Sequence, residues 1–165
     1  MGQANEPRSD CPINAAVEVF GDRWSLLVLR DIIFGDHRYF RELQAKSVEG
    51  IASNILADRL KRLVELGLLN REDTRPGQRA RYSLTEPAIQ LVPVLVQLGS
   101  WGLRHRPTSS AQRARAELLE QDGPALWNEF MDELRYSHLG ANIPPRSPSV
   151  RERLNGAYLA AVNSF

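Results

Sequence analysis

The 165-residue chain contains a single cysteine, Cys11, which excludes an intramolecular disulfide and a zinc site built from several cysteines. Its longest uninterrupted apolar runs extend over only five or six residues, far fewer than a membrane-spanning helix requires. The first residues lack the apolar core of a signal peptide, and Glu6 stands where N-myristoylation after Gly2 would need serine or threonine. We therefore expect a cytoplasmic protein with no membrane partner.

Motifs of catalytic sites are equally scarce. The chain has no HExxH, GxSxG, P-loop or paired-cysteine motif, and His37, His105 and His138 lack the spacing of metal ligands. An enzyme is therefore the weakest of the functional hypotheses, and the sequence predicts neither a cofactor nor a metal site.

The charge balance is nearly neutral over the whole chain but uneven along it. Lysine and arginine number 21 against 20 acidic residues, a net charge of +1. Residues 59–81 hold seven basic and three acidic residues, a local charge of +4, whereas residues 107–165 hold six basic and seven acidic residues. From charge alone, the basic stretch is compatible with an anionic partner or with an ordinary solvated surface.

Apolar periodicity predicts four helices before residue 67, separated by glycines. The second of them, capped by Asp22, is apolar on nearly every side and is expected to form the core. The fourth has one apolar face and one polar face. The expected ranges are 12–20, 23–34, 39–46 and about 52–66.

Two short strands are expected at 68–72 and 79–84, on either side of Pro76-Gly77, a pair typical of a hairpin turn. A long helix is expected at 86–104, capped by Thr85 and bent by Pro93.

A polar linker at 107–110 is expected to lead into a helical tail. Two tail helices are expected at 111–122 and 124–139, and a third opens at the capping box formed by Ser149 and Glu152. About 59 residues in three helices are marginal as an independent domain, so we expect the tail to dock on the preceding region or across a dimer.

Three helices followed by a hairpin form the layout of a winged helix-turn-helix. The predicted fold is therefore mainly α, with a small β-hairpin wing and a helical C-terminal extension. The predicted domains are a flexible N-terminus at 1–10, a winged-helix DNA-binding domain at 11–106 and the extension at 107–165.

The polar face of the helix at about 52–66 could enter the major groove of double-stranded DNA. Ser53 and Asn54 would then lie near base edges, while Lys61 and Arg62 would lie near phosphates. The wing at about 73–81 would reach a neighbouring groove or the backbone. The predicted DNA contacts are Arg41, Ser53, Asn54, Ala57, Asp58, Lys61, Arg62, Arg75, Gln78, Arg79 and Arg81.

Ordered motifs over residues 11–103 resemble the HxlR-type winged-helix transcription regulators, a family within the broader MarR-like group. They include Cys11-Pro12, Gly21-Asp22-Arg23-Trp24-Ser25-Leu26-Leu27-Val28-Leu29-Arg30, Phe40-Arg41-Glu42-Leu43, Leu56-Ala57-Asp58-Arg59-Leu60-Lys61-Arg62-Leu63, Tyr82-Ser83-Leu84-Thr85 and Pro93-Val94-Leu95. The resemblance implies a bacterial, cytoplasmic, homodimeric DNA-binding regulator, and we expect it to act as a repressor. Family members commonly carry serine at the position of Ala52, so Ser53 is the expected substitute as N-cap of the recognition helix.

The resemblance also implies that the first and last helices of the domain form the dimer. A two-fold dimer would place two recognition helices about 34 Å apart and bind a pseudo-palindrome. The alternative for these residues is a place in the core of the subunit. The implied interface residues are Ala16, Val17, Phe20, Leu91, Leu95, Leu98 and Trp101.

Several HxlR-type relatives sense oxidants or electrophiles through a cysteine at the start of the first helix, the position of Cys11. A thiol near a helix N-terminus can be activated because its thiolate is stabilised there, whereas a buried cysteine serves as a small hydrophobe. A small-molecule effector bound by the tail is another hypothesis. The competing function is a winged helix that binds protein and no DNA, and burial of Ser53, Asn54 and Lys61 would exclude the DNA-binding hypothesis.

Overall fold

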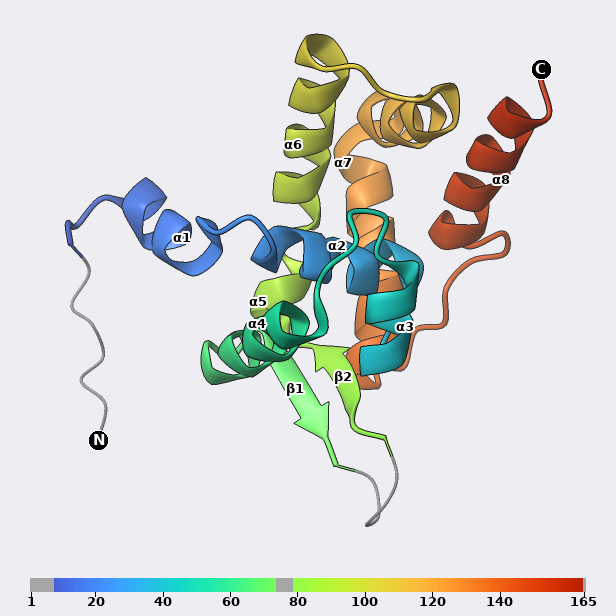
Figure 1. Ribbon diagram of the computed structural model, residues 1–165. Helices are drawn as coiled ribbons and strands as arrows, with labels where there is room; N and C mark the ends of the chain where they lie inside the picture. Colours follow the sequence, from blue (N-terminus) through green and yellow to red (C-terminus); the bar gives the residue numbers. More distant parts are fainter. Residues whose placement is uncertain (1–7, 74–78, 165) are drawn as a thin grey trace. The chain divides into compact units, whose positions relative to one another are not determined.

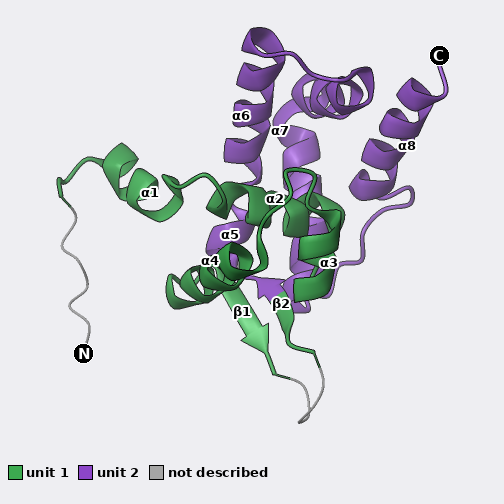
Figure 2. Ribbon diagram, viewed as in Figure 1, with its two compact units in different colours: residues 1–82 green, residues 83–165 purple. Residues whose placement is uncertain are grey.

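The computed structural model describes residues 8–73 and 79–164. The described chain forms two compact units, residues 1–82 and residues 83–165 (Figure 2), which we call the N-terminal unit and the C-terminal unit. The fold is mostly helical with one antiparallel hairpin, so the predicted fold class is confirmed (Figure 1). The N-terminal unit contains α1 (Pro12–Phe20), α2 (Ser25–Gly35), α3 (Phe40–Lys46), α4 (Ser53–Glu65), β1 (Leu69–Glu72) and the start of β2 (Arg81–Leu84).

Apolar side chains of α2, α3 and α4 form the core of the N-terminal unit. Helix α2 contacts both α3 and α4, as its apolar sequence predicts. It begins at Ser25, two residues later than expected, because Asp22 Oδ1 accepts hydrogen bonds from the backbone N–H groups of Trp24 (2.8 Å) and Ser25 (2.9 Å). The buried core residues of these helices are Val28, Leu29, Ile32, Ile33, Leu43, Leu56, Leu60 and Leu63.

An ion pair holds the turn between α3 and α4. The Arg30 guanidinium donates to both carboxylate oxygens of Glu49, at 2.7 and 2.8 Å, and also to Asp31. The hydrogen bonds from Arg30 lower the pKa of Glu49, which keeps its carboxylate charged. Gly50 follows with φ +69°, a conformation that costs glycine little. The turn is thereby anchored to the core helix α2 and sets the direction in which α4 leaves it.

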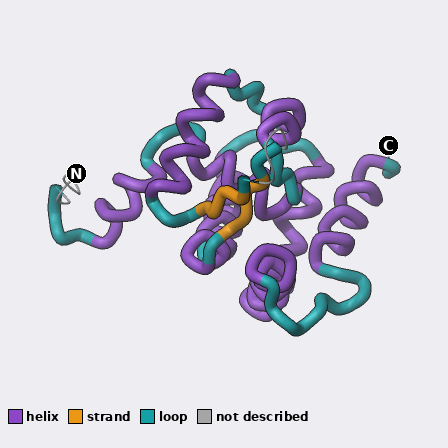
Figure 3. The backbone as a smooth tube through the Cα atoms, turned by 90° about the horizontal axis from the view of Figure 1, so that it is seen from below, coloured by secondary structure: helices purple, strands orange, loops and turns teal. Residues whose placement is uncertain are grey.

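The hairpin is attached to the start of α3 by backbone and side-chain hydrogen bonds. Tyr82 N–H donates to the Arg38 carbonyl at 2.8 Å, and the buried Arg38 Nε donates to the Tyr82 carbonyl at 3.1 Å. Tyr39 and Arg81 form an antiparallel bridge. Burial lowers the pKa of Arg38, and the positive charge of Arg81 adds to this effect. Figure 3 shows β1 and β2 as the two paired strands of a single hairpin.

The C-terminal unit contains α5 (Glu86–Ile89), α6 (Val92–His105), α7 (Ser110–Leu139) and α8 (Val150–Val162). The prediction of a single long helix at 86–104 is wrong, because the region forms two helices, α5 and α6, separated by Gln90 and Leu91. Pro93 therefore lies in the first turn of α6, where its missing N–H costs no helical hydrogen bond, instead of bending a continuous helix. Thr85 occupies the N-cap position of α5, but its side chain makes no capping hydrogen bond.

Helix α7 organises the C-terminal unit by contacting α5, α6 and α8. It consists of two helical segments joined at Gly123, whose φ of +62° matches the break expected between residues 122 and 124. Its N-cap is Ser109, which accepts from Gln112 N–H at 3.3 Å. The extension thus packs on the two helices that precede it. The core of this unit includes Leu119, Leu126, Phe130, Leu134, Val150 and Leu154.

Polar contacts tie the second segment of α7 to the last residue of β2 and to α5. Arg135 forms an ion pair with Glu86 at 2.7 Å, and the buried His138 Nδ1 accepts from Leu84 N–H at 3.0 Å. Within residues 8–73 and 79–164, no helix is long and apolar enough to cross a membrane.

Candidate nucleic-acid interface

Helix α4 has one face buried in the N-terminal unit and one face exposed. Leu56, Leu60 and Leu63 are buried on the inner face, four and three residues apart. The outer face carries polar and charged side chains, and Lys61 is the most open of its ion-paired groups, with 77% of its side chain exposed. Its Nζ lies 3.9 Å from Glu65 Oε1. The exposed residues of this outer face are Ser53, Asn54, Ala57, Asp58, Lys61 and Arg62.

The N-terminus of α4 lacks a side-chain cap. Ala52 occupies the N-cap position, and Ser53 is the first helical residue, so the prediction that Ser53 serves as N-cap is wrong. Ile51, buried just before the helix, anchors the turn in the core. The positive end of the helix dipole and the exposed side chains of Ser53 and Asn54 therefore occur at the same end of α4.

Two arginines of α4 bind partners inside the protein. The Arg62 guanidinium donates to the Glu18 carbonyl at 2.9 Å, and Arg59 forms ion pairs with Asp22 at 3.3 Å and with Asp58 at 2.5 Å. Partial burial by itself would raise the pKa of Asp22, but hydrogen bonds from Ser25 and from backbone N–H groups, together with the Arg59 charge, lower it. Asp22 therefore remains an anion that can hold Arg59.

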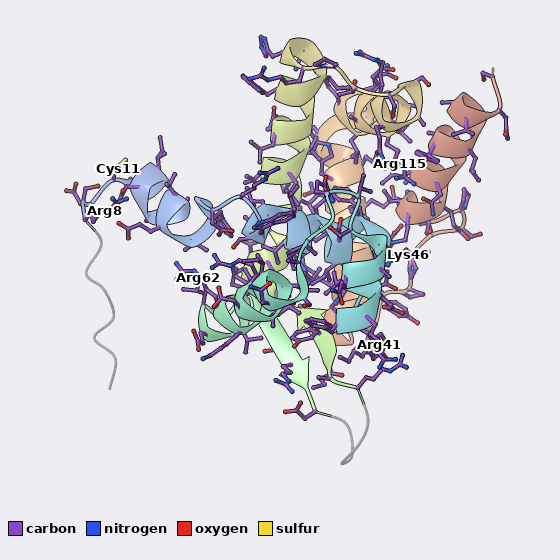
Figure 4. The ribbon with its side chains drawn as sticks, in the orientation of Figure 1. Arg8, Cys11, Arg41, Lys46, Arg62 and Arg115 are labelled. Atoms are coloured by element: carbon purple, nitrogen blue, oxygen red, sulfur yellow. The ribbon has the colours of Figure 1, made fainter. Side chains whose placement is uncertain are left out.

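Helix α3 adds exposed cations to the N-terminal unit. Arg41, in the first turn of α3, is exposed as a predicted DNA contact should be. Lys46, in the last turn, is also exposed and was not among the predicted contacts (Figure 4). No motif or apolar period singles out Lys46, because a lysine near a helix C-terminus is common on any solvated surface.

The described part of the wing carries three arginines with different surroundings. Arg71 pairs with Asp73 at 2.9 Å on the surface, Arg79 is exposed, and Arg81 is half-buried beside Tyr39. Arg75 and Gln78, the remaining predicted wing contacts, lie outside the described residues.

The predicted dimer residues differ in exposure. None of the residues of α1 is buried, although the helix carries Ile13, Val17 and Phe20. In α6, Pro93, Val94, Gln97, Leu98 and Trp101 line a shallow apolar groove, and 56% of Trp101 is exposed. Ala16, Val17, Leu98 and Trp101 are exposed, Phe20 and Leu95 are half-buried, and Leu91 is buried in the subunit.

Cys11 is an exposed thiol at the N-cap position of α1, and its carbonyl accepts the Ala15 N–H at 3.0 Å. The alternative of a buried cysteine that serves as a small hydrophobe is wrong. Within the described ranges, no cluster of histidine, cysteine or acidic side chains could hold a metal ion.

Comparisons with known proteins agree with this architecture. The family model of the HxlR-like helix-turn-helix matches residues 19–110. An uncharacterised HTH-type transcriptional regulator of Mycobacterium tuberculosis is 40% identical over 96 residues, which cover 58% of this chain and 59% of the relative. The chain thus spans about three fifths of that relative's length.

Another uncharacterised HTH-type transcriptional regulator, from Synechocystis, is 33% identical over 131 residues, which cover 75% of this chain and 93% of the relative. The crystal structure of PA1607, described as a candidate transcription factor, is similar with a TM-score of 0.55 and 38% identity, over 61% of this chain and 69% of that one. The chain belongs to the HxlR-like helix-turn-helix family.

Proposed function

We propose that this protein is a DNA-binding transcription regulator that inserts α4 into the major groove. The observation that carries the proposal is the exposed outer face of α4, on which Ser53, Asn54 and Lys61 lie opposite a row of buried leucines. A helix of this kind fits the major groove of B-DNA, where residues near its N-terminus meet base edges. The family relationship supports the same function.

The side chains on this face divide into base contacts and phosphate contacts. Asn54 can bond adenine through its amide in a bidentate manner, and Ser53 can bond a base or a phosphate. Lys61 and Arg41 suit phosphates because each presents an exposed cation. Ala57 and Asp58 complete the surface that faces the groove. The wing, with Arg79, Arg81 and the predicted contacts Arg75 and Gln78, would follow the adjacent backbone.

The regulator would act in the cytoplasm as a homodimer, and as a repressor. Exposed apolar side chains on α1, among them Val17, and on α6, among them Leu98 and Trp101, support a second copy as the partner, because each of these apolar surfaces gains from being covered. A two-fold dimer would place its recognition helices about 34 Å apart on a pseudo-palindromic operator.

Two signals are candidates for regulation. The exposed Cys11 could form an intersubunit disulfide, a mixed disulfide or an adduct with an electrophile. A small molecule bound by the C-terminal extension is the other candidate. The competing function, a winged helix that binds protein only, would not require the wing residues Arg75, Arg79 and Arg81 to project on the side of α4 that carries Asn54 and Lys61.

The test is a titration of the full chain against the DNA that flanks its own gene and against random DNA of the same length. It is done at two salt concentrations, with and without diamide. Nanomolar, salt-sensitive binding that prefers the flanking DNA supports the proposal. No binding to either DNA, even at low salt, contradicts it and favours protein contact.

The oxidant arm separates the two signals. Loss of binding with diamide in the wild type, but not in Cys11→Ser, identifies Cys11 as the sensor. Binding that ignores the oxidant in both proteins directs the search for a signal to the extension.

A further inference from the structure

The C-terminus of α1 is bonded by a side chain of the recognition helix. The last carbonyls of a helix have no partner within the helix and carry its negative dipole end. In α1, the Val17 carbonyl accepts Gly21 N–H at 2.6 Å, while the next carbonyl, of Glu18, accepts the Arg62 guanidinium at 2.9 Å. A cation from α4 thus satisfies a group that α1 cannot satisfy itself.

A second arginine acts on the segment that follows α1. Arg59 lies three residues before Arg62, so both side chains leave the same flank of α4. Its guanidinium is 3.3 Å from Asp22, the carboxylate that bonds the N–H groups at the start of α2. Two bonds from one flank of α4 therefore hold the end of α1 and the turn behind it.

Lys61 projects in a different direction from Arg62. Successive side chains on a helix are about 100° apart, and Figure 4 labels Arg62 on the side of α4 that faces α1. Lys61 Nζ is 3.9 Å from an exposed glutamate and its side chain is 77% exposed. Two neighbouring cations of one helix therefore differ in partner: a backbone carbonyl of α1 for Arg62, and the exposed Glu65 of the same helix for Lys61.

The attachment matters for α1 because that helix has few other anchors. It has nine residues, and none of them is buried. Glu18 also accepts hydrogen bonds through its carboxylate, from Arg8 N–H at 3.1 Å, Arg8 Nε at 3.2 Å and Asn14 at 2.8 Å. Glu18 thus bonds the segment before α1 through its side chain and α4 through its carbonyl.

We propose that Arg62 is a positioning residue that joins α1 to the recognition helix, and that it is not a phosphate contact. The bond lies at the edge of the outer face of α4, where Arg62 reaches the Glu18 carbonyl, so a displacement of α1 reaches the DNA-binding face through Arg62. The consequence for DNA rests on the function proposed above, whereas the link between the two helices does not.

The experiment compares Arg62→Ala with Lys61→Ala, two variants that each remove one positive charge from the same turn of α4. DNA affinity is measured over a series of salt concentrations, and hydrogen exchange of the α1 amides is measured on the DNA-free protein. A cation that contacts one phosphate contributes about −0.9 to the slope of log K against log salt. Circular dichroism checks that both variants are folded.

We expect Lys61→Ala to make the slope of log K against log salt less negative by about 0.9 and to leave α1 exchange unchanged. We expect Arg62→Ala to keep the wild-type slope, to weaken DNA binding roughly three- to tenfold, and to speed exchange in α1 several-fold, because a hydrogen bond is lost.

A salt slope that is less negative in Arg62→Ala than in the wild type overturns the assignment of Arg62 as a positioning residue, whatever the exchange result, because it identifies a phosphate contact. Unchanged exchange in α1 overturns the link between the helices. If the wild type binds no DNA, the proposed function fails, and the exchange comparison alone decides whether Arg62 joins α1 to α4.

Discussion

Helices α4 and α8 have the same length, 13 residues, but only α8 has a side-chain cap at its N-terminus. Helix α8 begins with a complete capping box: Ser149 Oγ accepts Glu152 N–H at 3.1 Å, and Glu152 Oε2 accepts Ser149 N–H at 2.7 Å. The buried Glu133 also accepts Val150 N–H. Helix α4 begins after Ala52, which offers no side-chain acceptor.

The N-terminus of α8 is therefore closed by protein side chains, whereas the N-terminus of α4 has no side-chain cap. At α8, protein groups satisfy the free N–H groups that every helix N-terminus leaves. At α4, the first turn carries no such acceptor and exposes Ser53 and Asn54. Phosphate oxygens are good acceptors for N–H groups in this position, so the bare end suits the proposed contact with DNA.

The largest expected effect is at the capped N-terminus of α8. Glu133→Ala removes a carboxylate that is 8% exposed and leaves the buried Val150 N–H without its acceptor. We expect a loss of about 2–3 kcal/mol in the free energy of unfolding, measured by urea denaturation. Glu133→Gln, which keeps an acceptor oxygen, is the control and should lose less. Equal and small losses in both variants would show that the bond contributes little.

The next largest effect is at the N-terminus of α4, which has no side-chain cap. Asn54→Ala should weaken binding to the specific operator by about 2 kcal/mol, because a bidentate contact to a base is lost. Binding to random DNA and the free energy of unfolding should remain unchanged, since Asn54 is exposed. The measurement is a titration of both DNAs by fluorescence anisotropy. The same loss on both DNAs would remove Asn54 from base recognition.

A smaller effect tests whether the capping box of α8 has any part in DNA binding. Ser149→Ala should lower the free energy of unfolding by about 1 kcal/mol, because Glu152 N–H loses its acceptor. DNA affinity should not change. A change in operator affinity without a change in stability would contradict the division of roles between the two helix ends.

The smallest effect comes from giving α4 an N-cap side chain at position 52. Ala52→Ser and Ala52→Asp should each raise the free energy of unfolding by roughly 0.5–1 kcal/mol, because each supplies an N-cap acceptor. Only Ala52→Asp should weaken DNA binding at low salt, since its carboxylate repels the phosphates. Thermal denaturation and salt-dependent titration measure the two outcomes. Equal DNA affinity in both variants would argue against phosphate near this end.

Elements whose signals are local were predicted well. The capping box at Ser149 and Glu152 and the break near Gly123 were both expected and are both present. The predicted α2 began two residues too early because Asp22 bonds the N–H groups of Trp24 and Ser25 before the helix begins. The α5–α6 break was missed because the apolar spacing continues through it, with Ala88, Ile89, Leu91 and Val92 all buried.

The candidate site was predicted unevenly for the same reason. Apolar spacing was enough to separate the buried leucines of α4 from Asn54 and Lys61, because a helical period involves only residues three and four apart. It could not distinguish Lys61 from Arg62, which are adjacent in the sequence and carry the same charge.

Residue pattern alone predicted the winged helix and the exposed outer face of α4, since both depend on neighbours along the chain, and ordered motifs indicated the family. Tertiary structure decided which cations are available to a partner. Arg62 bonds Glu18, Arg30 bonds Glu49 and Arg38 bonds Tyr82, pairs that are 44, 19 and 44 residues apart. A guanidinium binds whichever acceptor the folded chain brings within about 3 Å, and no local pattern specifies that acceptor.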